Sequence, residues 1–120
     1  MNLELETRGS VLVASVLDHR FDSASVEDFR ARIGAAVASG AARIVLDLSP
    51  VRFMDSGALG SVLAVLKTLP PGGDLRLAGV HDPVRGVFRM TRLDKVVAID
   101  DTVEAAAAAL GYVPAGPERV

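Results

Sequence analysis

The segment from Ile44 to Leu69 restricts the possible fold more than any other part of the chain. It opens with the nearly continuous apolar run 44–48, which is typical of a central strand in a sheet covered on both faces. After a short connection, apolar residues recur at helical spacing. These residues are Leu59, Val62, Leu63 and Leu66. A buried strand that leads into an amphipathic helix indicates an α/β protein with a parallel sheet.

The predicted helix begins at Ser56 and has an unusual outer face. A serine just before a periodic apolar set is typical of a helix N-cap, because its hydroxyl can accept a hydrogen bond from the first turn. The face opposite the apolar residues consists of mostly small, uncharged residues: Gly57, Gly60, Ser61, Ala64 and Lys67. A surface helix usually carries bulky charged side chains there. We therefore expect this face to allow close approach of another protein surface.

The rest of the chain alternates between strand and helix patterns. Strands are expected at 3–7 and 11–17, which form a hairpin, and at 43–48, 74–78 and 96–99. Helices are expected to begin near Ser25, Ser56, Asp82 and Asp101. This order predicts one α/β domain over residues 1–110, with a mostly parallel sheet of four to five strands, an N-terminal β-hairpin and about four helices. Residues 111–120 contain two prolines and two glycines and are expected to form a flexible tail.

The composition argues against several classes of protein. The chain has 120 residues, half of them hydrophobic, and a net charge of −2 from 13 basic and 15 acidic residues. It has no cysteine, which excludes disulfides, thiol catalysis and cysteine-bound zinc and fits a reducing compartment. The chain lacks a basic stripe of the kind that binds nucleic acid. Its early apolar run 11–17 is too short to span a membrane. Because Glu4 and Glu6 precede that run in place of basic residues, we expect no signal peptide and a soluble cytoplasmic protein.

Motifs for catalysis, metal binding or nucleotide binding are weak. The nucleophile motif of hydrolases is Gly-x-Ser-x-Gly, but Met54 stands two residues before Ser56. The aspartates and the two histidines, His19 and His81, lack metal-ligand spacing, and no Gly-rich loop ends in Lys-Ser or Lys-Thr. We therefore expect no catalytic residue, no metal and no cofactor. A small serine hydrolase stays open as an alternative, since the members of a catalytic triad need not be close in sequence.

The turn at the start of the predicted helix carries a family resemblance. The run Asp55-Ser56-Gly57-Ala58-Leu59-Gly60, after the strand 45–48 and Phe53-Met54, resembles the signature of the STAS domain, and more closely that of bacterial anti-sigma factor antagonists. The family pattern is roughly Asp-Ser-Ser-Gly-Leu-Gly, and its first serine, which a partner kinase phosphorylates, falls on Ser56. The resemblance extends from Val11 through Leu110. The chain departs from the pattern at Gly57, which replaces the second serine, and in the longer loop 18–22.

The resemblance implies a phosphorylation switch in which Ser56 is the single acceptor and the chain is not itself an enzyme. The unmodified chain would bind an anti-sigma factor, a serine kinase of the histidine-kinase-like ATPase fold, and so free a sigma factor. Phosphorylation would break the complex, and a serine phosphatase would restore it. Functional groups in such sheets gather at the carboxyl ends of the strands. The residues expected at the partner surface are Asp22, Ser23, Asp55, Gly57, Gly60, Ser61 and Ala64.

Two further interpretations keep the STAS fold but change the readout. In one, the same switch controls another bacterial response, such as biofilm formation or motility. In the other, the chain is a subunit of a lipid-transport assembly, and the small helix face docks constitutively without phosphorylation. Intact mass after incubation with ATP and a cognate kinase, beside esterase activity on a generic ester, separates these interpretations from the hydrolase. The sequence makes no prediction of the oligomeric state.

Overall fold

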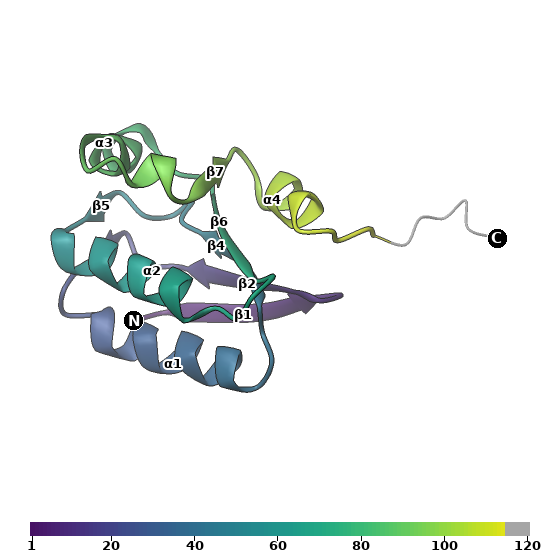
Figure 1. Ribbon diagram of the computed structural model, residues 1–120. Coiled ribbons are helices and arrows are strands. Elements are labelled where there is room, and N and C mark those ends of the chain that lie inside the picture. Colours follow the sequence, from purple (N-terminus) through teal and green to yellow (C-terminus); the bar gives the residue numbers. More distant parts are fainter. Residues whose placement is uncertain (115–120) are drawn as a thin grey trace.

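The chain folds into alternating strands and helices, and the structure, a computed structural model, describes residues 1–114 (Figure 1). The strands are β1 (Leu3–Arg8), β2 (Val11–Val16), β3 (Arg20–Phe21), β4 (Arg43–Asp47), β5 (Phe53–Met54), β6 (Asp74–Ala78) and β7 (Ala98–Asp100). The helices are α1 (Val26–Ala38), α2 (Ser56–Thr68), α3 (Asp82–Met90) and α4 (Val103–Ala109), with a short 3-10 helix η1 (Leu93–Lys95). The predicted tail lies mostly beyond the described residues.

Five strands form the main sheet, in the order β1-β2-β4-β6-β7. Strand β1 runs antiparallel to β2, whereas the other neighbours pair in parallel. The predicted α/β fold with an N-terminal hairpin and a mostly parallel sheet is therefore confirmed. Strand β7 begins two residues later than expected, since Val96 is exposed and Val97 follows η1.

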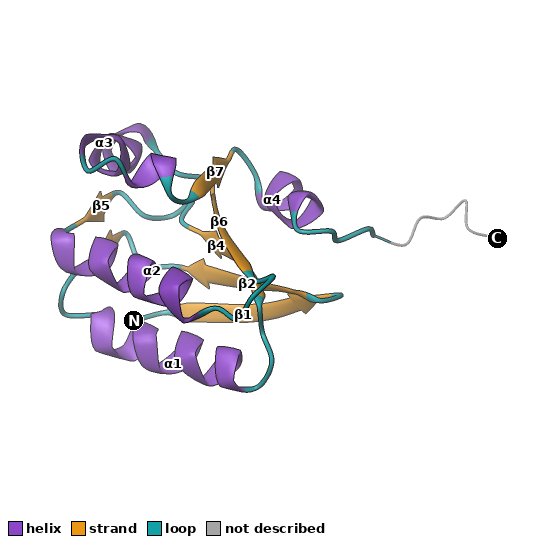
Figure 2. Cartoon of the chain, in the orientation of Figure 1, coloured by secondary structure: helices purple, strands orange, loops and turns teal. Residues whose placement is uncertain are grey.

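Helices cover both faces of this sheet, as Figure 2 shows by element type. Helices α1 and α2 lie side by side on one face and enclose the larger core, in which Phe29, Ile33 and Leu46 are almost fully buried. Helix α4 lies on the other face over a smaller apolar cluster that includes Val13, Val45 and Ala107. Burial on both faces explains why β4 has a nearly continuous apolar sequence.

Strands β3 and β5 form a separate parallel pair outside the main sheet. The register places Arg20 opposite Phe53 and Phe21 opposite Met54. Buried side chains hold the pair against the core. Phe21 and Met54 are both buried, and the Phe21 ring packs against the Phe29 ring with centroids 4.8 Å apart. The sequence predicts only a polar loop and a short connection here, so this pair was missed.

Helix α2 is rotated about its axis relative to the prediction. Its buried residues are Ala58, Leu59, Ser61, Val62 and Val65, whereas Leu63 is only half-buried. The predicted place of Ser61 on the outer face is wrong: the residue is 2% exposed, and its hydroxyl donates a hydrogen bond of 2.7 Å to the Ala58 carbonyl. The small side chains at 58 and 61 face inward because α2 packs against both the sheet and α1.

Candidate functional site

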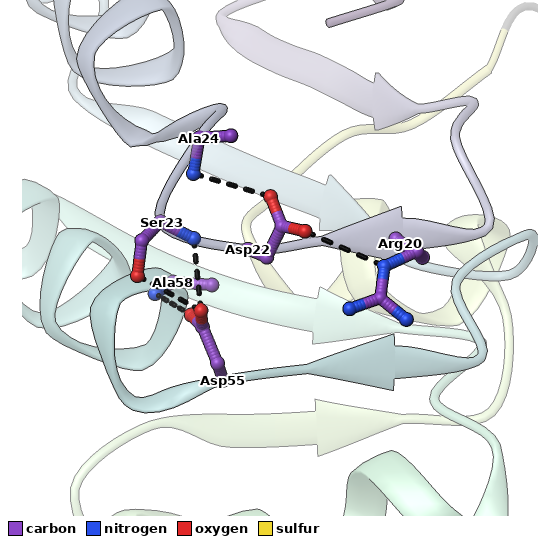
Figure 3. A network of polar contacts seen from close by, with 6 residues as sticks. All are labelled: Arg20, Asp22, Ser23, Ala24, Asp55 and Ala58. Atoms are coloured by element: carbon purple, nitrogen blue, oxygen red, sulfur yellow. Dashed lines mark hydrogen bonds and ion pairs between the residues drawn. The ribbon is translucent and has the colours of Figure 1, made fainter.

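Asp55 organises the start of α2 and links it to a second loop (Figure 3). One carboxylate oxygen, Oδ1, accepts a hydrogen bond of 2.9 Å from the Ala58 N–H. The other, Oδ2, accepts from the Ser23 N–H at 2.9 Å and from the Ser23 hydroxyl at 2.8 Å. Asp55 is thus the N-cap, and Ser56 is the first helical residue. The prediction of Ser56 as the N-cap is wrong by one position, since aspartate caps as well as serine.

The same bonds set the charge of the site. The Ala58 N–H, followed by the backbone and hydroxyl of Ser23, lowers the pKa of Asp55 below its ordinary value. Hydrogen bonds to a carboxylate favour its charged form. Asp55 therefore carries a negative charge at neutral pH, directly beside Ser56.

The loop before α1 is held in place by Asp22. Its Oδ1 accepts from the Ala24 N–H at 3.2 Å, and its Oδ2 lies 3.4 Å from the Arg20 Nε. Helix α1 begins just after Ser25, as predicted, but the Ser25 side chain makes no capping bond. This loop keeps the Ser23 hydroxyl turned toward Asp55 (Figure 3).

Gly57 fits closely under this loop. A Cβ atom at position 57 would lie 2.5 Å from the Ser23 Oγ and 3.3 Å from the Ser23 Cα. Gly60, one turn further along α2, has no such neighbour within 4 Å. The absence of a side chain at 57 therefore allows the contact between Ser23 and Asp55, whereas Gly60 leaves open surface.

An exposed stripe runs along α2 from Ser56. Ser56, Gly60 and Lys67 are exposed, and Leu63 lies half-buried between them. Within residues 1–114 the Ser56 hydroxyl has no hydrogen-bond partner. Ala64 lies at the edge of this stripe, in a shallow hollow against α1.

The structure thus brings most of the expected site residues together. Asp22, Ser23, Asp55, Ser56 and Gly57 form one cluster, and Gly60 continues it on α2. Ser61 is excluded from this surface by burial, and Ala64 is half-buried beside α1.

Two residues at this edge were not predicted. The Arg20 guanidinium lies over the Phe53 ring, 4.1 Å from its centroid, and Phe53 is 41% exposed. No sequence signal marks Phe53 as exposed, because the connection 49–54 also contains the apolar residues Val51 and Met54, both of which are buried.

A serine, a histidine and an aspartate, the residue types of a catalytic triad, lie close together around Ser49, but they are not arranged for catalysis. The Ser49 hydroxyl donates to Asp47, while the His81 Nε2 contacts the carbonyl oxygen of Ser49 and not its hydroxyl.

Among residues 1–114 no group of three or more histidine, cysteine, aspartate or glutamate side chains could hold a metal ion. No helix in that same range is long and apolar enough to cross a membrane.

Comparisons with known proteins agree with this geometry. The sequence profile of the STAS domain matches residues 2–106, so the chain belongs to the STAS domain family. A Bordetella bronchiseptica protein with the provisional name anti-sigma factor antagonist BtrV is 34% identical over 110 residues, which is 91% of this chain and 94% of that protein.

Solved structures show the same similarity. An anti-sigma factor antagonist from Mycobacterium paratuberculosis superposes with a TM-score of 0.84 at 27% identity, over 91% of this chain and 92% of that one. The Bacillus cell-fate determinant SpoIIAA in its phosphorylated form gives a TM-score of 0.70 at 29% identity, over 91% of this chain and 99% of that one. SpoIIAA, an anti-sigma factor antagonist, has also been solved unphosphorylated.

Proposed function

We propose that this protein is an anti-sigma factor antagonist that is switched off by phosphorylation of Ser56. The observation that carries the proposal is the position of Ser56, which is exposed at the first residue of α2 and whose hydroxyl has no hydrogen-bond partner among the described residues 1–114. Its relatives named as anti-sigma factor antagonists, one of them solved with and without phosphate, support the same assignment.

The unmodified chain binds an anti-sigma factor through the start of α2 and the loop before α1. This surface comprises Asp22, Ser23, Asp55, Gly57 and Gly60, with Ala64 at its edge. The partner is a serine kinase of the histidine-kinase-like ATPase fold, and binding frees the sigma factor that the kinase had held. The open surface at Gly60 lets the partner approach the helix backbone closely.

Phosphorylation changes this surface and leaves the fold intact. The Ser56 Oγ attacks the γ-phosphorus of ATP, its proton passes to a base of the kinase, and ADP leaves. The phosphate adds about −1.5 to −2 charge at neutral pH. A helix N-terminus usually favours an anion, but Asp55 already occupies the Ala58 N–H and is itself charged. We therefore expect little local stabilisation, and strong repulsion of a partner surface that fits the unmodified serine. A serine phosphatase reverses the change.

The direct test is phosphosite mapping. The purified chain is incubated with ATP and each candidate anti-sigma kinase from the same genome, and intact mass and peptide mapping follow. The proposal predicts one added phosphoryl group, on Ser56, and none in a Ser56→Ala variant. Ser10→Ala, in the exposed turn between β1 and β2, is the matched control and should be phosphorylated as wild type. A phosphate on another residue, or a fully phosphorylated Ser56→Ala variant, contradicts the proposal.

A further inference from the structure

We infer that the partner-binding surface extends past α2 onto the β3–β5 pair, where Arg20 and Phe53 together form an anchor. The partner that fits this anchor is the same anti-sigma factor, with an apolar pocket for the Phe53 ring and a carboxylate beside it for Arg20. The inference rests on the proposed function, and it adds Arg20 and Phe53, which are not among the residues expected at the partner surface from the sequence.

Phe53 has the properties of an interface anchor. Successive residues of a strand point to opposite sides, so burial of Met54 in the core directs Phe53 outward. Phe53 is 41% exposed, although its backbone N–H donates a hydrogen bond of 3.2 Å to the His19 carbonyl and so fixes the start of the strand. Large aromatic side chains contribute more binding energy than their number suggests, because they fill partner pockets with little loss of conformational freedom.

Arg20 orients this ring and offers free donors of its own. Its guanidinium stacks on Phe53 at 4.1 Å, and only its Nε contacts Asp22, at 3.4 Å. Within residues 1–114 the two terminal nitrogens of Arg20 have no hydrogen-bond partner, and the side chain is 64% exposed. The planar fork of an arginine matches a carboxylate with two parallel hydrogen bonds. A partner carboxylate is thus the complement that the anchor lacks.

A continuous chain of contacts joins this anchor to Ser56. Arg20 contacts Asp22, and the next residue Ser23 donates to Asp55 (Figure 3). Asp55 directly precedes Ser56 in the chain. The parallel register places Arg20 directly opposite Phe53, so both side chains lie on the same side of the pair. Arg20 and Phe53 therefore adjoin the cluster around Ser56, so the proposed partner surface can extend to them.

Leu5 and Arg89 offer comparisons without this combination. Leu5 on the edge strand β1 is 39% exposed, nearly as much as Phe53, but within residues 1–114 no side-chain hydrogen bond or ion pair links it to Ser56. Arg89 is likewise exposed on α3 and makes no ion pair within residues 1–114. These two residues serve as matched controls.

The test measures affinity by titration calorimetry, with the purified anti-sigma kinase that phosphorylates this chain as the probe. Phe53→Ala and Arg20→Ala should each weaken binding roughly tenfold or more. The double variant should weaken binding by less than the product of the two effects, because the residues act as one unit. Leu5→Ala and Arg89→Ala should stay within about twofold of wild type. Circular dichroism and thermal midpoints verify that each variant is folded.

The outcomes separate this anchor from the switch. Wild-type affinity in a folded Phe53→Ala variant, or losses as large in Leu5→Ala, overturns the anchor even if phosphorylation of Ser56 still abolishes binding. Loss of binding in Phe53→Ala, with phosphorylated Ser56 binding as well as unmodified Ser56, supports the anchor and overturns the switch. If the two effects multiply fully in the double variant, Arg20 and Phe53 are independent contacts, and the inference of a joint anchor is wrong.

Discussion

Two glycines of α2 should respond to the same substitution in opposite directions. Gly57→Ala places a methyl group 2.5 Å from the Ser23 Oγ and 3.3 Å from the Ser23 Cα. The hydroxyl can rotate away, but it then leaves Asp55, and the backbone of Ser23 must also shift. Gly60→Ala meets no atom within 4 Å.

The magnitudes follow from these distances. Forcing a methyl group into a filled contact typically costs about 1–3 kcal/mol. Alanine recovers up to about 1 kcal/mol of helix propensity over glycine. We therefore expect Gly57→Ala to lower the free energy of unfolding by up to about 2 kcal/mol. Gly60→Ala gains the propensity without the contact and should raise it by about 0.5–1 kcal/mol.

Urea unfolding of both variants measures this difference, with the slope m checked for constancy. A rescue variant tests the cause: Ser23→Gly removes the obstructing side chain, so the further cost of Gly57→Ala should be much smaller in that background. Amide exchange at the Ser23 N–H should be faster in Gly57→Ala than in wild type. If Gly57→Ala is as stable as Gly60→Ala, the close fit of Ser23 over Gly57 is wrong.

Three further predictions test the packing and charge of the site. Leu59→Ala should lower the free energy of unfolding by about 2–5 kcal/mol because Leu59 is buried, whereas Leu63→Ala on the same helix should lower it by about 1 kcal/mol. Equal denaturant midpoints for the two variants would mean that α2 buries a different face. Ser61→Arg should lower the free energy of unfolding by more than about 3 kcal/mol, because it buries an unpaired charge, while Gly60→Arg should stay folded. A stable Ser61→Arg variant would mean that Ser61 lies on the outer face of α2 after all. Because the pKa of Asp55 is lowered in the folded state, its charge stabilises the fold above the ordinary value of 3.8, and this contribution is lost as the pH falls through the lower folded-state value. The stability advantage of wild type over Asp55→Asn, measured by urea unfolding, should therefore shrink on acidification through that range, and a difference independent of pH would contradict the role of the carboxylate.

The main architecture follows from local sequence patterns. The nearly continuous apolar run of β4 and the alternation of strand and helix patterns along the chain are sufficient to predict a hairpin and a mostly parallel sheet, because each pattern has the period of its own element. The register of that sheet and the position of α4 on its far face are settled by packing between segments distant in sequence, which no local pattern contains.

The details of the site depended on tertiary contacts. The predicted apolar face of α2 shares Leu59 and Val62 with the observed one, but packing against α1 and the sheet buries Ala58, Ser61 and Val65 in place of Leu63 and Leu66. Serine and aspartate are equally good N-caps, and the contact with Ser23 selects Asp55. The β3–β5 pair has two residues in each strand, too few for a recognisable period, so Arg20 and Phe53 were missed.

The most direct test of the switch compares two pure forms of this chain. Its anti-sigma kinase is titrated with the unmodified protein and with protein phosphorylated only at Ser56, and circular dichroism confirms that both are folded. The phosphate on Ser56 should weaken binding by roughly a hundredfold or more, because misplaced charge at a buried interface costs several kcal/mol. Equal affinity for the two folded forms would contradict the switch.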